Sequence, residues 1–301
     1  MNLTDKQKGI ALSLIGVLVI TPDSLLIRLI SMPSWELLFY RGLIPFIFLL
    51  ILLLLYYKKN FLHSLLITGL SGLFYAILVA LGNITFVISI QNTNVANTLI
   101  MVALTPFATA ILSSVFLKEH PSKKMWLTII SCFLVVLFIF YDSYQGNRMI
   151  GDVFGLLTAI FIGGSAVVVR YSKLVNFLHS LLIAKLLTFL IPILFIQSFP
   201  ETLLIDLREF YLIILMGICL FIALSFITLA PRYIAAYEVE IFFVLETILG
   251  PIWVWLFIYE QPTTKTFIGG ICIILIIMSH TFSDLRKKKL SLLFIMFQLS
   301  R

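Results

Sequence analysis

Ten long apolar stretches alternate with short polar connections along the chain. Most of them hold about 20 residues, the length that an α-helix needs to cross the hydrocarbon core of a bilayer. They lack the apolar–polar alternation of transmembrane strands, as in FIFLLILLLLYY at residues 46–57. The pattern therefore predicts an all-α polytopic membrane protein with ten transmembrane helices. We expect them near residues 9–30, 34–57, 62–87, 94–117, 123–141, 150–171, 178–198, 209–229, 233–258 and 264–282.

The composition excludes several classes of protein. Of the 301 residues, 61% are hydrophobic and 12% are charged, whereas soluble domains carry roughly 45–50% apolar and about 25% charged residues. A soluble enzyme, a disordered chain and a coiled coil are thereby ruled out. The ten spans leave connections too short for a separate soluble domain. The expected partners are the lipid bilayer and a small-molecule substrate, and we expect no nucleic acid despite the net charge of +7.

The basic residues predict how the chain is oriented. Cytoplasmic loops of membrane proteins are enriched in Lys and Arg. With the N-terminus inside, the cytoplasmic segments hold Lys6, Lys8, Lys58, Lys59, Lys118, Lys123, Lys124, Arg170, Lys173, Arg232 and Arg286 to Lys289, and the outer segments hold only Arg28, Arg148, Arg208 and Lys265. Both termini are therefore expected in the cytoplasm, in the plasma or inner membrane of the cell. The first apolar stretch lacks a small-residue cleavage site and is interpreted as an uncleaved span.

An internal repeat divides the chain into two parts. Residues 104–137 and 245–277 each hold an apolar helix, a Glu-x-Pro turn and a second apolar helix. Three pairs match at one constant offset: Leu104 with Leu245, Glu119 with Glu260, and Pro121 with Pro262. Since each repeat holds five spans, the second would enter the membrane from the opposite side, an arrangement common in secondary transporters. The sequence thus predicts two inverted five-helix repeats.

The repeats define the domain organisation. Residues 1–8 are expected to form a cytoplasmic N-terminus, 9–141 the first repeat, 150–282 the second repeat, and 283–301 a basic cytoplasmic tail. The tail ends in the apolar stretch LSLLFIMFQLSR, which is too short to span a bilayer. We expect this stretch to lie in the membrane interface beside the basic run, with a poorly ordered tail as the alternative.

The sequence resembles the EamA family of the drug/metabolite transporter superfamily. Three stretches and the duplicated layout carry the resemblance: TPDSLLIRLISMPSWELLFYRG at 21–42, ANTLIMVALTPFATAILSSVFLKEHPS at 96–122, and PRYIAAYEVEIFFVLETILGPIWVWLFIYEQPT at 231–263. The resemblance implies a ten-helix fold in which spans 1–4 and 6–9 line a central cavity and spans 5 and 10 pack outside. It also implies transport, often export, of small metabolites such as amino acids. The chain departs from the family's usual sequence at Thr247, where a proline is usual, and at Lys118 and Tyr259, where glycine is usual.

Ionisable residues within the spans are the main candidates for function, because charge inside a bilayer is costly and marks functional sites by default. At about 1.5 Å per residue, Asp23 and Glu246 lie roughly 20 Å above the inner boundary, level with Arg41. Lys185, Glu238 and Glu240 lie near a second level about 10 Å above that boundary. The sequence therefore predicts two charged layers, each a candidate gate.

The complete set of candidate residues for substrate binding or gating adds uncharged polar side chains that need partners inside a membrane. Interfacial anchoring is a competing interpretation for Arg28. The set is Asp23, Arg28, Tyr40, Arg41, Tyr75, Asn83, Asn97, Lys185, Tyr237, Glu238, Glu240 and Glu246. Arg41 is expected to bind a carboxylate, and Asp23, Glu238 or Glu246 to bind an amine or carry a proton.

These features favour a secondary transporter, with an exporter preferred and proton coupling through the helix of Glu246. Alternatives are a lipid flippase and an intramembrane enzyme. The sequence has no G-x-x-x-x-G-K-[ST], H-E-x-x-H or G-x-S-x-G motif. We therefore expect no catalytic residues, no cofactor and no metal site. Small residues at Gly151, Gly155, Gly269 and Gly270 are expected to let helices approach closely, and the last pair leaves a homodimer open.

The orientation is directly testable. Reporter fusions made after Lys124 and after Lys265 are expected to report opposite sides of the membrane, because the charge pattern places the first in the cytoplasm and the second outside. The measurement is paired activity of a reporter active only in the cytoplasm and one active only outside. If both fusions report one side, the inverted repeat is wrong.

Overall fold

The computed structural model describes residues 5–118, 123–146, 148–172, 177–196, 205–230, 233, 236–276 and 279. This part of the chain is helical throughout, with no strand. Six helical segments are long and apolar enough to cross a membrane: Asp5–Leu29, Ser34–Leu66, Gly69–Asn92, Val95–Phe116, Met149–Tyr171 and Leu207–Leu229. Four shorter apolar helices are Trp126–Ile139, Phe177–Ile193, Leu245–Ile258 and Thr264–Ile276. The all-α prediction is confirmed, and the expected tail at 283–301 lies outside the described residues.

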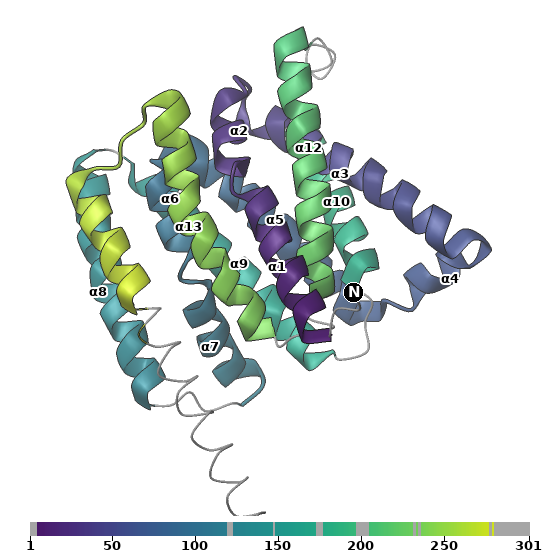
Figure 1. The fold of residues 1–301 in the computed structure, drawn as a ribbon, viewed down its shortest axis with the longest axis horizontal. Coiled ribbons are helices and arrows are strands. Elements are labelled where there is room, and N and C mark those ends of the chain that lie inside the picture. The colour runs from purple at the N-terminus through teal and green to yellow at the C-terminus, as the bar shows by residue number, and fades with distance from the viewer. Residues whose placement is uncertain are drawn as a thin grey trace, which may run out of the picture.

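The segments follow one another as antiparallel rods joined by short connections (Figure 1). The helices are α1 (Asp5–Ile20), α2 (Asp23–Leu29), α3 (Ser34–Tyr57), α4 (Phe61–Leu66), α5 (Gly69–Asn92), α6 (Val95–Val102), α7 (Thr105–Phe116), α8 (Lys123–Gln145), α9 (Met149–Tyr171), α10 (Phe177–Ile193), α12 (Leu207–Leu229) and α13 (Ala236–Ile258). A 3₁₀ turn, Lys58–Asn60, joins α3 to α4. The helix Thr264–Ile276 follows α13 and lies beside α8 at one edge of the molecule (Figure 1).

Two of the long segments are broken near their middle. The first breaks at Thr21 and Pro22, between α1 and α2, and another breaks at Ala103 and Leu104, just before Pro106 in α7. Proline lacks an amide hydrogen and its ring clashes with the carbonyl four residues earlier, so it interrupts a helix. Pro251 behaves differently, since α13 continues through it. The first break places Asp23 at the start of α2.

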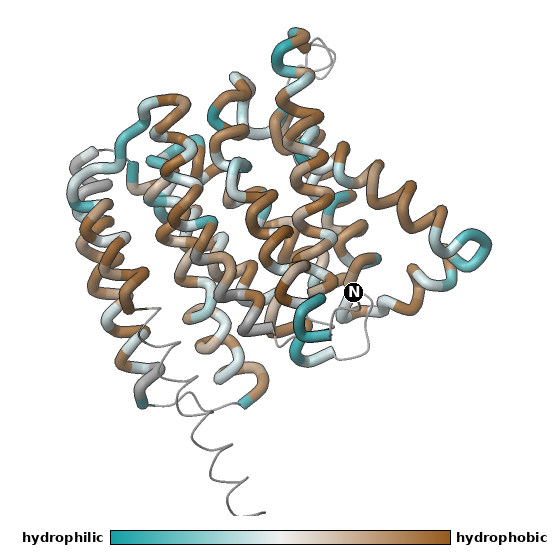
Figure 2. The backbone as a smooth tube through the Cα atoms, viewed as in Figure 1, coloured by the Kyte–Doolittle hydropathy of each residue, from teal (hydrophilic) through white to brown (hydrophobic). Residues whose placement is uncertain are grey.

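Apolar side chains cover both the interior and the outer surface of the bundle. Large hydrophobic residues such as Leu55, Leu66 and Phe116 are each at least 69% exposed. Contiguous exposed apolar surface on this scale is foreign to a soluble monomer and typical of lipid contact. Polar residues gather instead at helix ends and turns (Figure 2). The molecule therefore has the surface of an integral membrane protein.

Glycines allow the closest helix contacts. A Cβ atom on Gly42 of α3 would lie 2.4 Å from the backbone nitrogen of Phe189 in α10. The predicted glycine pair, Gly269 and Gly270, packs against helices of the same chain. A Cβ on Gly269 would meet Ile139 of α8, and one on Gly270 would meet Ile100 of α6. The contact at Gly42 therefore sets the register of α3 against α10.

Gly42→Ala is expected to destabilise the protein by about 1–3 kcal/mol, because the added methyl group meets backbone that cannot move aside. The measurement is thermal unfolding of the detergent-solubilised protein. Gly164→Ala is the matched control, since its nearest neighbour is a Leu78 methyl group at 3.4 Å. Equal unfolding temperatures for Gly42→Ala and wild type would contradict the prediction.

Candidate functional site

A buried ion pair lies where the first segment is broken. Arg41 of α3 donates from both terminal nitrogens to Asp23 of α2, with Nη1–Oδ1 at 2.5 Å and Nη2–Oδ2 at 2.7 Å. Both side chains are at most 3% exposed. Two parallel bonds between a guanidinium and a carboxylate form the strongest common pairing of side chains. The break in the helix thus brings the Asp23 carboxylate to the Arg41 guanidinium, which compensates its charge.

The surroundings of Arg41 are mostly apolar. Its guanidinium carbon lies 5.6 Å from the centre of the Phe86 ring in α5, within the range of a cation–π interaction. Tyr40, also buried, packs edge-on against Phe39. Within the described residues Arg41 Nε has no hydrogen-bond partner. The site therefore keeps one buried donor that an acceptor from outside the protein can satisfy.

Lys185 is a second buried cation, fully enclosed in α10. Its Nζ donates to Asn83 Oδ1 of α5 at 3.0 Å. No carboxylate lies within ion-pair distance of it in the described part of the chain. Arg41 and Asp23 are near enough to act on it electrostatically. Asn83 is thus the direct partner of Lys185, and of the two charged neighbours only Asp23 has the opposite charge.

Glu246 supplies the second acid. It lies in α13 with 9% of its surface exposed, and Asp23 and Arg41 both act on it electrostatically. It forms no ion pair with any described residue. We name Asp23, Arg41, Lys185 and Glu246 the central charge cluster. Its two acids and two bases come from four helices, α2, α3, α10 and α13.

Of the second charged layer expected from the sequence, only Lys185 lies among the described side chains, and Glu238 and Glu240 do not. Lys185 shares an electrostatic neighbourhood with Arg41 and Asp23. The cause is the register of α3 against α10, in which Gly42 faces Thr188 and Phe189. Lys185 is therefore only about one helical turn away from Arg41 along the axis. Depth arithmetic with straight helices overestimated this spacing.

The remaining predicted residues are distributed over the molecule. Tyr75 packs against Phe177 with ring centres 5.0 Å apart. Asn97 hydrogen-bonds to Asp152 and accepts a bond from Thr266. Arg28 pairs with Glu260, so its role is wider than interfacial anchoring. The side chains of Tyr237, Glu238 and Glu240 lie outside the described residues.

Sequence reasoning missed two buried ionisable residues. Asp152, in the first turn of α9, is fully buried and accepts a bond from Thr93 Oγ1 at 2.6 Å. His179, near the start of α10, is fully buried and its Nε2 lies 2.9 Å from Ser64 Oγ. The sequence signal beside Asp152 is Gly151, expected to allow close helix approach, and a Cβ there would lie 2.6 Å from Thr93.

Comparison with known proteins shows what the chain that carries this cluster is similar to. Residues 7–141 match the EamA-like transporter family. These residues form an EamA domain. The chain is also 23% identical over 281 residues to the pseudopaline exporter CntI from two strains of Pseudomonas aeruginosa, covering 89% of this chain and 94% of the relative. The EamA domain and the apolar helices support an integral membrane protein.

A solved structure supports the fold over nearly the whole length. A protein whose name states no function aligns with 92% of this chain and 98% of its own, with a TM-score of 0.61 and 14% sequence identity. The EamA domain covers α1 to most of α8 and includes Asp23 and Arg41. Lys185 and Glu246 lie in the second part of the chain, so the central charge cluster combines both parts.

Arg41→Ala is expected to destabilise the protein by about 3–5 kcal/mol, because it leaves the Asp23 carboxylate buried without its partner. Replacing both residues, by Arg41→Leu with Asp23→Leu, is expected to cost less because neither charge is stranded. Arg41→Lys should insert normally but lose transport affinity, since an ammonium cannot form the two parallel bonds. The measurements are thermal unfolding and a full substrate titration. Wild-type affinity and rate in Arg41→Lys would contradict a role in binding.

Proposed function

We propose that the protein is a secondary transporter that exports small polar metabolites carrying a carboxylate and an amine, by alternating access between two inverted five-helix repeats. The central charge cluster carries this proposal. Four ionisable side chains gather there in a protein whose surface is apolar, and such residues inside a membrane mark substrate or ion pathways. The EamA domain and the similarity to an exporter support the direction and the class.

The pairing of helices supports the repeat. Suppose that the spans α1–α8 correspond in order to α9 and the helices after it. Each contact between a helix of the first part and one of the second should then be matched by a contact between their counterparts. The contact of α5 with α9 has its mate in that of α12 with α1, and the contact of α5 with α10 in that of α12 with α3. Two contacts are their own mates: α3 with α10, and α6 with α13. These pairings are what a two-fold axis within the membrane plane requires.

The Asp23–Arg41 pair suits exchange with a substrate. A buried pair tolerates replacement of one partner only by a group of the same charge, since a stranded charge is costly. A substrate carboxylate can replace Asp23 on the guanidinium, and a substrate amine can replace Arg41 on the carboxylate. Arg41 Nε provides a further donor for the incoming carboxylate.

Lys185 and Glu246 are proposed to adjust the charge of the occupied site. Lys185, held by Asn83, offers a second cation to a substrate with more than one acidic group. Glu246 is proposed to carry a proton, because it is a buried carboxyl group that forms no ion pair with any described residue. Both act from the second repeat on a pair formed in the first, so substrate binding couples the two repeats.

The class of function can be tested in two steps. Metabolites released by cells with and without the protein are compared by mass spectrometry, and each enriched compound is then assayed with purified protein in liposomes. We expect transport of small zwitterionic compounds without ATP, and no transport by Arg41→Ala. Movement of phospholipid between leaflets with no metabolite transport would instead support the flippase alternative, and chemical conversion of the compound would support an enzyme.

Glu246→Gln is expected to make transport insensitive to a pH gradient while the protein still inserts and folds, because the amide cannot exchange a proton. The measurement is initial transport rate in liposomes with and without an imposed gradient. Glu209→Gln is the control, since Glu209 lies in the first turn of α12 outside the cluster. Wild-type transport that ignores the gradient would rule out proton coupling, whichever residue is changed.

A further inference from the structure

A second group of charged residues lies away from the central cluster, where α2 and α13 end and α6 begins. We call this the α2 end of the molecule; it is the upper part of Figure 1. The turn between α5 and α6 is its centre. This turn belongs to the first part of the chain, but two carboxylates from the second part bind it. It is therefore a contact between the two proposed repeats.

Glu260, just after α13, makes the first of these contacts. Its Oε1 accepts a bond from the backbone N–H of Val95 at 2.9 Å, and its Oε2 lies 3.1 Å from Nε of Arg28 in α2. A carboxylate at the start of a helix satisfies free amide hydrogens and interacts favourably with the helix dipole. Glu260 thus joins α13, α6 and α2 at a single point.

Arg28 closes the same contact from the other side. Its Nη2 donates to the backbone oxygen of Thr93 at 2.6 Å while its Nε faces Glu260. The side chains of Arg28 and Glu260 are 25% and 21% exposed. A partly solvated pair of this kind contributes little net stability, which suits a contact that must open and close. The central pair, at most 3% exposed, is far harder to separate.

Asp152 holds the other face of the turn. It accepts bonds from Thr93 Oγ1 at 2.6 Å and from Asn97 Nδ2 at 3.2 Å, and Asn97 in turn accepts a bond from Thr266. Asp152 is fully buried. This side of the turn is therefore tightly bound to α9, whereas the side facing Glu260 is nearer to solvent.

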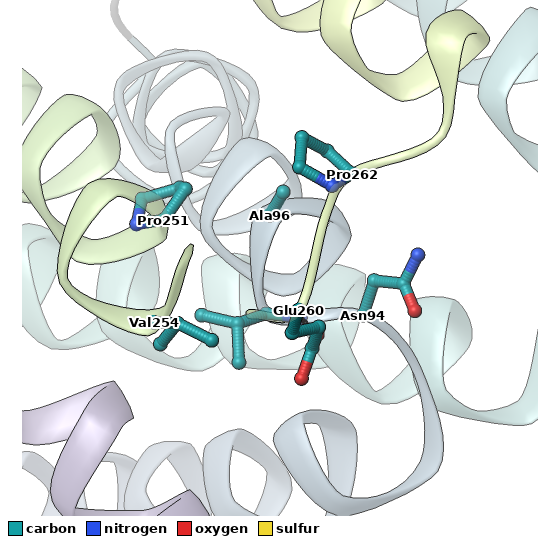
Figure 3. Close-up of a pocket in the computed structure, with 7 residues that line it drawn as sticks. Asn94, Ala96, Pro251, Val254, Glu260 and Pro262 are labelled. Atoms are coloured by element: carbon teal, nitrogen blue, oxygen red, sulfur yellow. Dashed lines mark hydrogen bonds between the residues drawn. The ribbon is translucent and has the colours of Figure 1, made fainter. Parts of the chain in front are cut away.

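Little space remains between α13 and α6 beside this contact. Figure 3 shows Pro251 and Val254 of α13 facing Ala96 of α6, with Glu260 and Pro262 of the following segment beside them. The crevice that they line is too narrow to hold a water molecule. The α2 end is closed in this structure.

We propose that Arg28 and Glu260 form a latch that closes the α2 end of the transport path, and that Glu260 must release Arg28 and the start of α6 for this end to open. The inference rests on the proposed function, because it assigns the latch to a transport path that opens at this end. Asp152 keeps the turn fixed to α9 in both states, so α13 moves against the turn.

Ser24 is a suitable reporter of opening. It lies one turn before Arg28 on the same face of α2, is 3% exposed, and its Oγ lies 3.3 Å from the position of a Cβ on Gly250 in α13. Ser24→Cys is placed in a background in which Cys132, Cys219 and Cys272 are alanine. A membrane-impermeant methanethiosulfonate reagent is then applied to right-side-out and inside-out vesicles.

Glu260→Gln and Arg28→Gln are each expected to raise the labelling rate of Cys at position 24 at least threefold, from one side of the membrane only. Glu260→Gln keeps an oxygen for the Val95 amide but loses the ion pair. Ser34→Ala is the matched control: it removes the hydrogen bond to Gln91 at the start of α3, within the first part of the chain. It should leave the rate unchanged.

Unchanged labelling in both latch variants, from either side, would overturn the proposal, and so would equal acceleration by Ser34→Ala. Folding of each variant is checked by its elution as a single species in detergent. Since labelling needs no substrate, these results stand apart from the proposed function. Faster labelling in a protein that transports nothing would retain the latch as an opening contact and reject the transporter.

Discussion

The Asp23–Arg41 ion pair is the constraint around which the first part of the bundle is arranged. In hydrocarbon neither charge can remain alone, and both are at most 3% exposed. Their meeting requires the break at Pro22, which starts α2 at Asp23, and it requires α3 to present Arg41 at the same depth. Trp253 of α13 donates to Thr21 Oγ1 at this break, so α13 is also positioned by it. An unbroken first helix would carry Asp23 in a different direction.

Close backbone contacts determine what the remaining charges face. Gly42 brings α3 against α10 and so sets Lys185 near the ion pair, and Gly151 brings α9 against Thr93, so that Asp152 reaches the turn before α6. In both places a glycine is the sequence neighbour of a charged residue: Gly42 follows Arg41, and Gly151 precedes Asp152. A bulkier residue would separate the helices and leave the charge without its hydrogen bonds, at a cost that hydrocarbon makes large.

The order and nature of the helical segments were predictable from the sequence, because about 20 consecutive apolar residues have few alternatives to a membrane helix. Segments predicted at 34–57 and 150–171 are observed as Ser34–Tyr57 and Met149–Tyr171. The shared depth of Asp23 and Arg41 also followed from counting residues. The contact between Lys185 and Asn83 did not, since it depends on helix rotation and register. Neither did the burial of Asp152, which depends on packing between distant segments.

Charge balance links the central cluster to transport. With all four groups ionised, Asp23 and Glu246 cancel Arg41 and Lys185, so the empty cluster is neutral. A bound anion would add an uncompensated negative charge in a medium of low dielectric constant, which is unfavourable. In the proposed transporter, protonation of Glu246 would remove this excess, so the binding of an anion and of a proton would favour each other. For a zwitterion the balance is already met within the substrate, and no proton is required. The charge of the substrate would thus decide whether its transport is coupled to protons.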